Sequence, residues 1–151
     1  MPLSIRRASV TDASTIVEFN RRMAQETEHK TLDQQTLASG VAAVLTDPAK
    51  GFYLVAELAG EPVGQLLITP EWSDWRDGWF WWVQSVYVRE DARRRGVFRG
   101  LFEEVVRLAA AAGEVVGVRL YVERDNARAQ RTYSSLGMAE SGYRLYERML
   151  K

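Results

Sequence analysis

Residues 86–101 read Val86-Tyr87-Val88-Arg89-Glu90-Asp91-Ala92-Arg93-Arg94-Arg95-Gly96-Val97-Phe98-Arg99-Gly100-Leu101. The segment begins as an apolar strand, passes through a short polar loop and continues as an amphipathic helix. The first turn of a helix leaves several N–H groups without partners, and the helix dipole makes that end partly positive. A helix that starts just beyond the end of a strand is therefore suited to bind an anion, and phosphate above all.

The charge of this loop supports the same interpretation. Arginines outnumber acids there (Arg89, Arg93, Arg94, Arg95 and Arg99 against Glu90 and Asp91), whereas the whole chain has 20 basic and 20 acidic residues. From composition alone, a solvated, charge-rich surface loop explains the segment equally well. Gly100 favours binding, because a glycine inside a helix costs about 1 kcal/mol relative to alanine. It is easier to explain where a ligand or a packed neighbour approaches the backbone.

β-forming residues and turn signals predict the strands around this segment. We expect strands over residues 3–8, 51–59, 63–69, 79–89 and 115–122, with a turn at 59–62 and a loop at 70–78. Within residues 79–89, Trp79, Trp81, Val83, Ser85 and Tyr87 would face one way, and Phe80, Trp82, Gln84, Val86 and Val88 the other. Both faces are largely apolar, so we expect a central strand that is covered on both sides.

Helical spacing and capping residues predict helices over residues 11–25, 32–45, 96–112 and 127–136. About two further strands are expected near the C-terminus, of which Tyr143–Leu150 alternates like the last one. This order predicts an α/β (α+β) fold, with a mixed central β-sheet of six to seven strands and helices on both faces. No linker or repeat interrupts the chain, so residues 1–151 are expected to form a single domain.

A second informative element covers residues 120–138. Asn126, Ala129 and Tyr133 are spaced to share one face of its helix. Asn126 can cap the helix or donate to a carbonyl, Ala129 leaves room for a ligand, and Tyr133 can present its hydroxyl on that face. Alternatively, Asn126 is only a cap and Tyr133 is only a core aromatic with a solvated tip.

The two elements together resemble the GNAT superfamily of acetyl-CoA-dependent N-acetyltransferases. Arg93–Phe98 is similar to the acyl-CoA signature Gln/Arg-x-x-Gly-x-Gly/Ala, with Phe98 where the family most often has Gly or Ala. Residues 126–138 are similar to the second motif, Asn-x-x-Ala-x-x-x-Tyr-x-x-Leu-Gly-Met, at the expected distance downstream. The resemblance covers nearly the whole chain and implies the GNAT fold.

The resemblance also implies an activity, in which an amine attacks acetyl-CoA, the cosubstrate, directly. The acceptor would be a primary amine of a small molecule or peptide. Loop N–H groups would hold the pyrophosphate, the preceding strand would pair with the pantetheine arm, and an N–H near Val86 would bind the carbonyl oxygen. Tyr133 would act as general acid toward the departing thiolate. The implied cofactor-binding residues are Val86, Tyr87, Val88, Arg93, Arg94, Arg95, Gly96, Val97, Phe98, Arg99, Gly100, Asn126, Ala129 and Tyr133.

The resemblance does not identify the group that takes the proton from the amine. Some family members carry a glutamate in the central strand, where this chain has Trp82, which cannot accept a proton. Loop acids or a bound water are the candidates. The acids are Glu26, Glu28, Glu71, Asp74 and Asp77, and each is alternatively a solvated surface acid. Glu26 and Glu71 are the expected catalytic candidates. His29 could also serve as base, although a lone surface histidine is more often incidental.

The acceptor site is expected to comprise Glu26, Glu28, Trp72, Trp75, Trp82 and Gln84. Its acids would line a cleft and attract a cationic amine. Trp72 and Trp75 would form either a cation–π wall for that amine or a contact within a dimer. A homodimer is consistent with the family.

Composition excludes several other classes. The chain has no cysteine and one histidine, His29, so a disulfide framework, a cysteine nucleophile and a two-histidine metal site are ruled out, and we expect no metal. Zero net charge argues against nucleic-acid and membrane partners. No signal-like or membrane-spanning run is present, so the cytoplasm is expected. Two other functions stay open: a non-catalytic acyl-CoA sensor of the same fold and a generic phosphate-binding module.

Overall fold

The computed structural model describes residues 2–151, which form two compact units. The first unit extends to Tyr121 and the second is Val122–Lys151. The first contains β1 (Leu3–Arg7), η1 (Val10–Asp12), α1 (Ala13–Glu28), α2 (Gln34–Thr46), β2 (Phe52–Leu58), β3 (Glu61–Ser73), β4 (Gly78–Val88), η2 (Glu90–Ala92), α3 (Val97–Ala112) and β5 (Val115–Leu120). The second contains α4 (Ala127–Ser135). The single domain expected over residues 1–151 stays a prediction.

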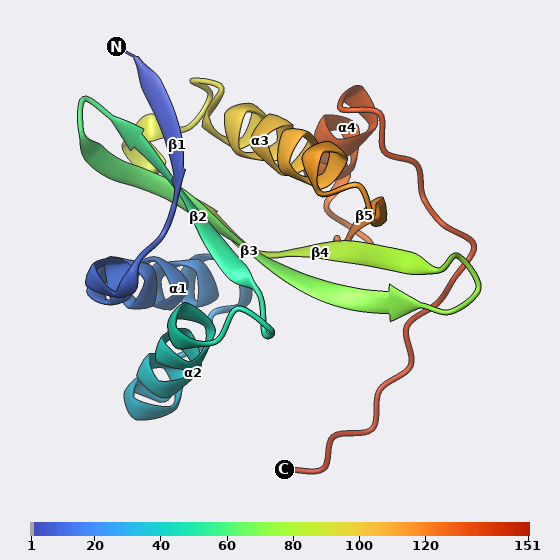
Figure 1. Cartoon of the computed structure of the whole chain (residues 1–151). Helices are drawn as coiled ribbons and strands as arrows, with labels where there is room; N and C mark the ends of the chain where they lie inside the picture. Colours follow the sequence, from blue (N-terminus) through green and yellow to red (C-terminus); the bar gives the residue numbers. More distant parts are fainter. Residues whose placement is uncertain (1) are drawn as a thin grey trace. The chain divides into compact units, whose positions relative to one another are not determined.

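The first unit is built on a five-stranded sheet in the order β1-β2-β3-β4-β5 (Figure 1). Neighbouring strands are antiparallel, except that β5 runs parallel to β4. Helices α1 and α2 cover one face of the sheet and α3 covers the other (Figure 1). The predicted mixed sheet with helices on both faces is therefore confirmed.

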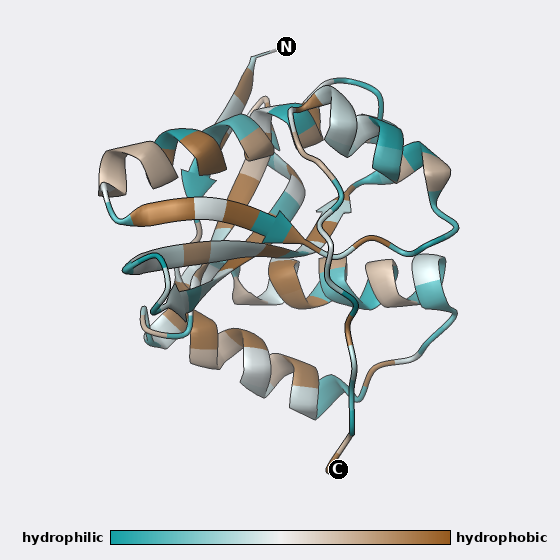
Figure 2. Cartoon of the chain, turned by 90° about the vertical axis from the view of Figure 1, so that its right-hand side faces the viewer, coloured by the Kyte–Doolittle hydropathy of each residue, from teal (hydrophilic) through white to brown (hydrophobic). Residues whose placement is uncertain are grey.

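Each face of the sheet has its own apolar core. Under α3, Leu54, Leu66 and Ile68 of the sheet pack with Leu101 and Val105 of the helix. On the other face, the buried residues are Ile16, Val17, Val41, Tyr53 and Leu67. The strands are largely apolar, whereas the helices alternate between apolar and polar residues (Figure 2). This is the pattern expected when a sheet is covered on both sides.

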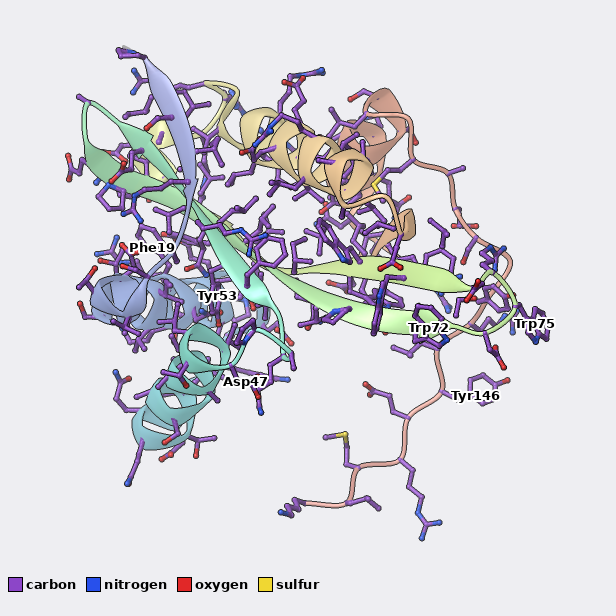
Figure 3. The ribbon with its side chains drawn as sticks, in the orientation of Figure 1. Phe19, Asp47, Tyr53, Trp72, Trp75 and Tyr146 are labelled. Carbon is purple, nitrogen blue, oxygen red and sulfur yellow. The ribbon has the colours of Figure 1, made fainter. Side chains whose placement is uncertain are left out.

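The hairpin of β3 and β4 is longer than predicted, and the loop expected over residues 70–78 is wrong. Strand β3 continues to Ser73, which pairs with Gly78, so only residues 74–77 form the turn. The rings of Trp72 and Trp79 pack edge to face with centroids 4.9 Å apart. Figure 3 shows Trp72 near the tip of the hairpin. Cross-strand aromatic packing of this kind stabilises the pairing of the two strands. The polar residues of the segment had suggested a loop instead.

Strand β4 contains a β-bulge that overturns the predicted assignment of faces. Leu67 pairs with Gln84, but Gln65 pairs with Tyr87, so β4 has one extra residue between these pairs. Beyond the bulge the alternation is reversed. Val86 therefore packs with the core under α3. Tyr87 lies instead against Phe19 of α1, with ring centroids 5.2 Å apart.

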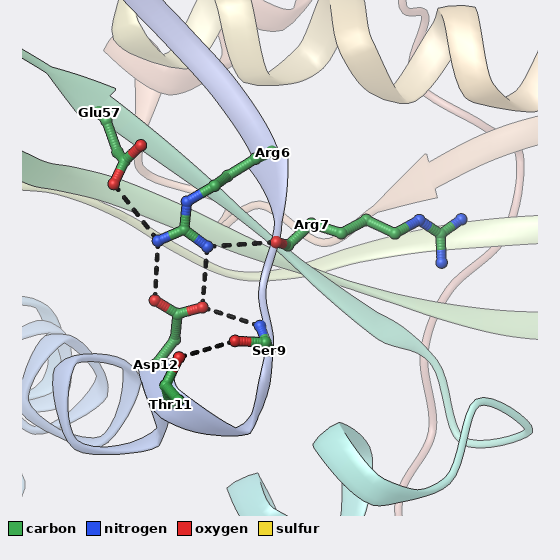
Figure 4. A network of polar contacts seen from close by, with 6 residues as sticks. All are labelled: Arg6, Arg7, Ser9, Thr11, Asp12 and Glu57. Atoms are coloured by element: carbon green, nitrogen blue, oxygen red, sulfur yellow. Dashed lines mark hydrogen bonds and ion pairs between the residues drawn. The ribbon is translucent and has the colours of Figure 1, made fainter. Parts of the chain in front are cut away.

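The connection from β1 to α1 is held by a network of charged groups (Figure 4). Arg6 donates from both terminal nitrogens to the two oxygens of Asp12, at 2.9 Å each. Asp12 also accepts from the backbone N–H of Ser9 at 2.8 Å, and Arg6 reaches Glu57 of β2 at 3.3 Å. The network joins the sheet to the start of the helix that packs against β4.

The count of six to seven strands is corrected to five in the described residues. Residues 143–150, predicted as a final strand, form no strand and pair with no described strand. Alternating sequence predicts an extended backbone, but a strand exists only when a neighbour supplies the ladder of hydrogen bonds. Within residues 2–151, no helix is both long and apolar enough to cross a membrane.

Candidate functional site

Strands β4 and β5 pair over only the first half of β4. Their parallel partners run from Trp79 opposite Val115 to Val83 opposite Leu120, where β5 ends. Strand β4 continues to Val88 and remains paired with β3 on its other side. Over residues 84–88, the second edge of β4 therefore has no strand partner among the described residues. Such an edge offers backbone N–H and C=O groups to an extended ligand, which can add as a strand.

The bulge lies within this unpaired stretch and is held by a buried amide. Gln65 of β3 is fully buried, and its Nε2 donates to the carbonyl oxygen of Ser85 at 3.1 Å. Ser85 has a φ of 51°, which is unfavourable for a residue other than glycine. The Oε1 atom of Gln65 is buried and has no hydrogen-bond partner among the described residues. The amide thus fixes the backbone at the point where β4 leaves β5.

The arginine loop leads from the unpaired edge into α3. Gly96 is the residue before the helix and has a φ of 78°, which a residue with a side chain rarely adopts. A Cβ there would meet no neighbour within 4 Å, so the backbone conformation, not space, calls for glycine. As a glycine, Gly96 has no side chain with which to cap the helix. The positive end of the helix dipole lies at this loop.

The arginines of the loop differ in what they bind. Arg89 forms ion pairs with Asp91 and Glu61, at 2.7 Å each, and its hydrogen bonds hold the pKa of the Asp91 carboxyl below its usual value. Arg93 donates to the carbonyl oxygen of Val88 at 2.8 Å and to Glu26 at 2.7 Å. In contrast, Arg94 and Arg95, both exposed, form no ion pair with any described residue. Arg94 and Arg95, which directly follow Arg93, are therefore the cations of this loop that are available to a ligand.

Gly100 is explained by a packed neighbour. A Cβ at this position would lie 2.7 Å from Cδ2 of Leu3, so β1 packs directly against the helix backbone there. The N–H of Gly100 donates to the carbonyl oxygen of Gly96 at 3.0 Å, as expected within a helix. Its contribution is therefore to helix–sheet packing. Phe98, the departure from the signature, is half-buried, and its ring lies 6.1 Å from that of Phe102.

A cavity of about 660 Å³ lies beside the end of β4 and the second half of α1. It is lined by Arg22, Glu26, Tyr87, Arg89, Glu90 and Asp91. Glu26 reaches this region through its ion pair with Arg93. The predicted base Glu26 thus lies at the arginine-loop end of β4.

The β3–β4–β5 part of the sheet carries an aromatic and charged surface on the side of α1 and α2. This open face consists of Glu71, Phe80, Trp82, Gln84, Arg119 and Tyr121. Its side follows from alternation with Leu67, which packs in the core under α1 and α2. Trp82 donates from Nε1 to Oε1 of Glu71 at 2.7 Å, and its ring stacks on that of Tyr121 with centroids 4.5 Å apart. Gln84 donates to Thr69 at 2.5 Å.

The two predicted acidic segments are not brought together. Glu26 lies beside the arginine loop, and Glu28, at the end of α1, pairs with Lys30 at 3.3 Å. Glu71 belongs to β3 and pairs with Phe80, near the opposite end of β4. Asp74 and Asp77 lie in the turn of the same hairpin. The acids are therefore distributed along β4 and do not line one cleft.

The loop tryptophans lie at the tip of the hairpin. Trp75 is 87% exposed in the turn, and Trp72 is half-exposed against Trp79 (Figure 3). Trp82 and Gln84 lie on the open face, so of the expected acceptor residues these two share a surface with Glu71. Sequence reasoning missed Arg119 and Tyr121. Their proximity depends on the parallel register that sets Trp82 opposite Arg119, which no local pattern reveals.

In the second unit, Asn126 caps α4. Its Oδ1 accepts from the backbone N–H of Ala129 at 3.0 Å, as one of the two interpretations of Asn126 anticipated. The helix ends at Ser135, and Gly137 follows with a φ of 86°. Tyr133 is half-buried, and burial raises the pKa of its phenol above the ordinary value of 10.0. A phenol in that condition keeps its proton at neutral pH.

Comparisons with known proteins agree with this architecture. The model of the acetyltransferase (GNAT) family matches residues 13–138. The crystal structure of a possible acetyltransferase from Clostridium difficile 630 is 44% identical, with a TM-score of 0.93 over 100% of this chain and 99% of that chain. Comparison with curated proteins finds no match.

More distant structures share the fold. A predicted acetyltransferase from Clostridium acetobutylicum, solved with acetyl-CoA, is 16% identical, with a TM-score of 0.81 and coverage of 99% of this chain and 97% of that one. A ribosomal-protein-alanine N-acetyltransferase from Brucella melitensis biovar Abortus 2308 is 17% identical, with a TM-score of 0.80 and coverage of 99% and 100%. With its motifs, its sheet and the family match over most of its length, the chain belongs to the GNAT family of acetyltransferases.

Proposed function

We propose that this protein is an acyl-CoA N-acyltransferase that moves the acetyl group of acetyl-CoA to a primary amine of a small molecule or peptide by direct attack. Membership of the family supports acetyl transfer in general, and the acetyl-CoA bound by the Clostridium acetobutylicum protein supports the donor. One observation carries the proposal. The unpaired edge of β4 over residues 84–88 leads directly, through the arginine loop, to the start of α3 at Gly96.

The groups along this path suit the two ends of the donor. Backbone groups of Val86, Tyr87 and Val88 would pair with the amides of the pantetheine arm, as a neighbouring strand would. The N–H groups of the first turn of α3, with Arg94 and Arg95, would hold the pyrophosphate. Arg93 would act as a strut that ties the loop to β4 and α1, because its guanidinium is already bonded to both.

The reaction requires a proton acceptor for the amine, a donor to the carbonyl oxygen and an acid for the thiolate. We assign the first role to Glu71, acting through a chain of bound waters along the open face, because it shares that face with Trp82 and Gln84. Glu26 is held by Arg93 at the other end of β4. A backbone N–H beside the bulge, near Val86, would donate to the carbonyl oxygen. Tyr133 would protonate the departing thiolate, and its raised pKa keeps the phenol protonated until then.

The donor site is tested by measuring acetyl-CoA affinity by calorimetry for the wild type and for Arg94→Gln/Arg95→Gln. The double variant should bind at least about 10-fold more weakly, because a hydrogen bond to a charged group contributes roughly 1.5–3 kcal/mol. The matched control is Arg107→Gln, which removes an exposed arginine farther along α3 that pairs with Glu104. The control should bind as the wild type does.

Turnover is tested by following release of the CoA thiol with a panel of amines. Transfer to at least one amine supports the proposal, and failure to bind acetyl-CoA would refute it. Tight binding without turnover on any amine would favour the acyl-CoA sensor. Equal affinity for acetyl-CoA and for inorganic pyrophosphate would favour the generic phosphate-binding module. The cytoplasmic location and the homodimer stay predictions.

A further inference from the structure

Two guanidinium groups converge on one buried ring of the open face. Arg119 of β5 lies over Phe80 with its Cζ atom 3.5 Å from the ring centroid, and Arg76 of the hairpin turn lies 5.2 Å from it. Phe80 is only 8% exposed, so the ring is a fixed support for both cations. A guanidinium that rests its flat face on a ring leaves its N–H edges free to bind a planar anion.

The acids nearby make only one direct contact with this pair. Arg119 reaches Oε1 of Glu71 through one long contact of 3.3 Å, and the same oxygen accepts the shorter bond from Trp82. Arg76 forms no ion pair with any described residue, although Asp74 and Asp77 belong to the same turn. Among the described residues, Glu71 is thus the one carboxylate in an ion pair with either guanidinium, and the indole of Trp82 shares it. The remaining N–H groups of Arg119 and Arg76 therefore stay available to a ligand.

We infer that the acceptor amine carries a carboxylate, which Arg119 binds with support from Arg76. This inference rests on the proposed function, because it names the class of acceptor for that same site. The stacked rings of Trp82 and Tyr121 border the guanidinium of Arg119 and offer an apolar support for the body of the acceptor. The substrate class is thus an amino acid or short peptide, in place of the simple cationic amine that clustered acids would attract.

The strand register limits the length of this acceptor. Arg119 pairs with Trp82, which lies three residues before the bulge at Ser85. A strand advances about 3.3 Å per residue, so Trp82 and Ser85 are roughly 10 Å apart along β4. The guanidinium of Arg119 lies over Phe80 and is therefore farther still from the bulge. An amine at the bulge and a carboxylate at Arg119 must therefore be well separated. A terminal side-chain amine, as in lysine, or the N-terminus of a dipeptide fits this spacing better than an α-amine does.

Matched pairs of amines that differ only in the carboxylate test the inference. Lysine is compared with cadaverine, and 5-aminopentanoate with pentylamine, in both calorimetry with CoA present and steady-state acetylation. The wild type should prefer the carboxylated member of each pair by at least 10-fold in kcat/KM. Arg119→Gln should raise KM for that member by about 10- to 100-fold relative to the member without a carboxylate, the loss typical of a charge-assisted contact. Because Arg119 also contacts Glu71, any effect through that acid falls on both members, so the ratio within each pair isolates recognition of the carboxylate.

Further variants separate recognition from folding. Arg119→Lys keeps the charge but loses the planar fork, so its KM should fall between those of the wild type and Arg119→Gln. Arg76→Gln changes an exposed turn residue and should raise KM for the carboxylated amines by a smaller factor. Arg107→Gln is the control and should change neither amine of a pair. Acetyl-CoA affinity should stay constant in all of them.

The outcomes distinguish this inference from the proposed function. Equal use of both members of each pair, or equal losses for both in Arg119→Gln, would overturn the inference and leave the transferase intact. Arg119-dependent binding of the carboxylated amines without any acetylation would support the inference and refute the transferase. An Arg119→Gln protein that fails to fold shifts the test to Arg76→Gln, where an unchanged ratio within each pair would overturn the inference.

Discussion

Replacing Asp12 with asparagine tests how the sheet holds the start of α1, the helix that carries Glu26. Asp12 is 7% exposed and accepts two hydrogen bonds from Arg6 and one from the N–H of Ser9 (Figure 4). Asparagine has nearly the same shape and keeps one oxygen that can accept from Ser9. The substitution therefore removes the charge and one of the two acceptors that face Arg6.

The magnitude follows from the exposure of the two partners. A hydrogen bond to a charged group contributes roughly 1.5–3 kcal/mol, whereas an exposed ion pair contributes only about 0–1 kcal/mol. The carboxylate is shielded, but the side chain of Arg6 is 39% exposed, so solvent screens the pair. We expect Asp12→Asn to lower the free energy of unfolding by about 2 kcal/mol at pH 7. Urea unfolding followed by far-UV circular dichroism measures this loss.

The loss should depend on pH in a defined direction. The Arg6 guanidinium holds the pKa of Asp12 below its ordinary value of 3.8, and burial only partly opposes this. For a carboxyl whose pKa is lower in the folded state, the stabilisation is complete above the unfolded-state pKa and disappears as the pH falls through the folded-state pKa. The difference between wild type and variant should thus be constant from about pH 5 to 8 and shrink below about pH 4.

The matched control is Glu103→Gln, which removes an exposed acid 3.8 Å from Arg99 on α3. Such a pair contributes little, so the control should lose no more than about 0.5 kcal/mol. A loss as small as that for Asp12→Asn at pH 7 would refute the reasoning. So would a difference from wild type that stayed unchanged down to pH 3.

Three further substitutions address the site itself. Tyr133→Phe should lower kcat by about 100-fold or more, with little change in the KM for acetyl-CoA. Because burial raises the pKa of Tyr133, the alkaline fall in the kcat of the wild type should lie above pH 10. A variant with the full rate would remove the role of Tyr133 as the acid. Gly100→Ala should destabilise the fold by roughly 1–3 kcal/mol in thermal unfolding, because the new Cβ meets Leu3. The affinity for acetyl-CoA should stay constant. Weaker binding at unchanged stability would indicate that a ligand approaches the backbone at Gly100. Gln65→Leu should change the free energy of unfolding by no more than about 1 kcal/mol, because a hydrogen bond and an unpaired buried oxygen are lost together. It should nevertheless lower kcat about 10-fold, because the bulge at Ser85 loses its support. An unchanged kcat would show that the bulge needs no such support.

The local parts of this protein could be predicted from the sequence because their signals lie within a few residues. Apolar spacing and the two flanking glycines located α3 to within one residue. Gly96 before the helix and Gly113 after it both have a positive φ, which interrupts the helical backbone. A cap at Asn126 was one of the alternatives that the same kind of signal offered, and the structure has it. The order of these elements and two spaced motifs were enough to indicate the family.

The pairing of distant segments could not be predicted in this way. The sequence from 70 to 78 is polar enough to suggest a loop, yet the partner strand extends β3 through most of it. The single extra residue at the bulge reverses which side of β4 carries Tyr87, and alternation alone cannot show where such a residue is inserted. The C-terminal segment shows the opposite error, since its alternation predicted a strand for which the described residues supply no partner.

The sequence by itself determined the helices, the arginine loop and the family, because these depend on neighbours along the chain. Only the tertiary structure decided which edge of β4 is unpaired, that Glu26 binds Arg93, and that Arg119 lies beside Trp82 and Glu71. Each of these depends on strand register or on helix packing across the sheet. A shift of one residue in register moves every side chain of a strand to the other face, so the chemistry of the acceptor side is a property of the folded sheet.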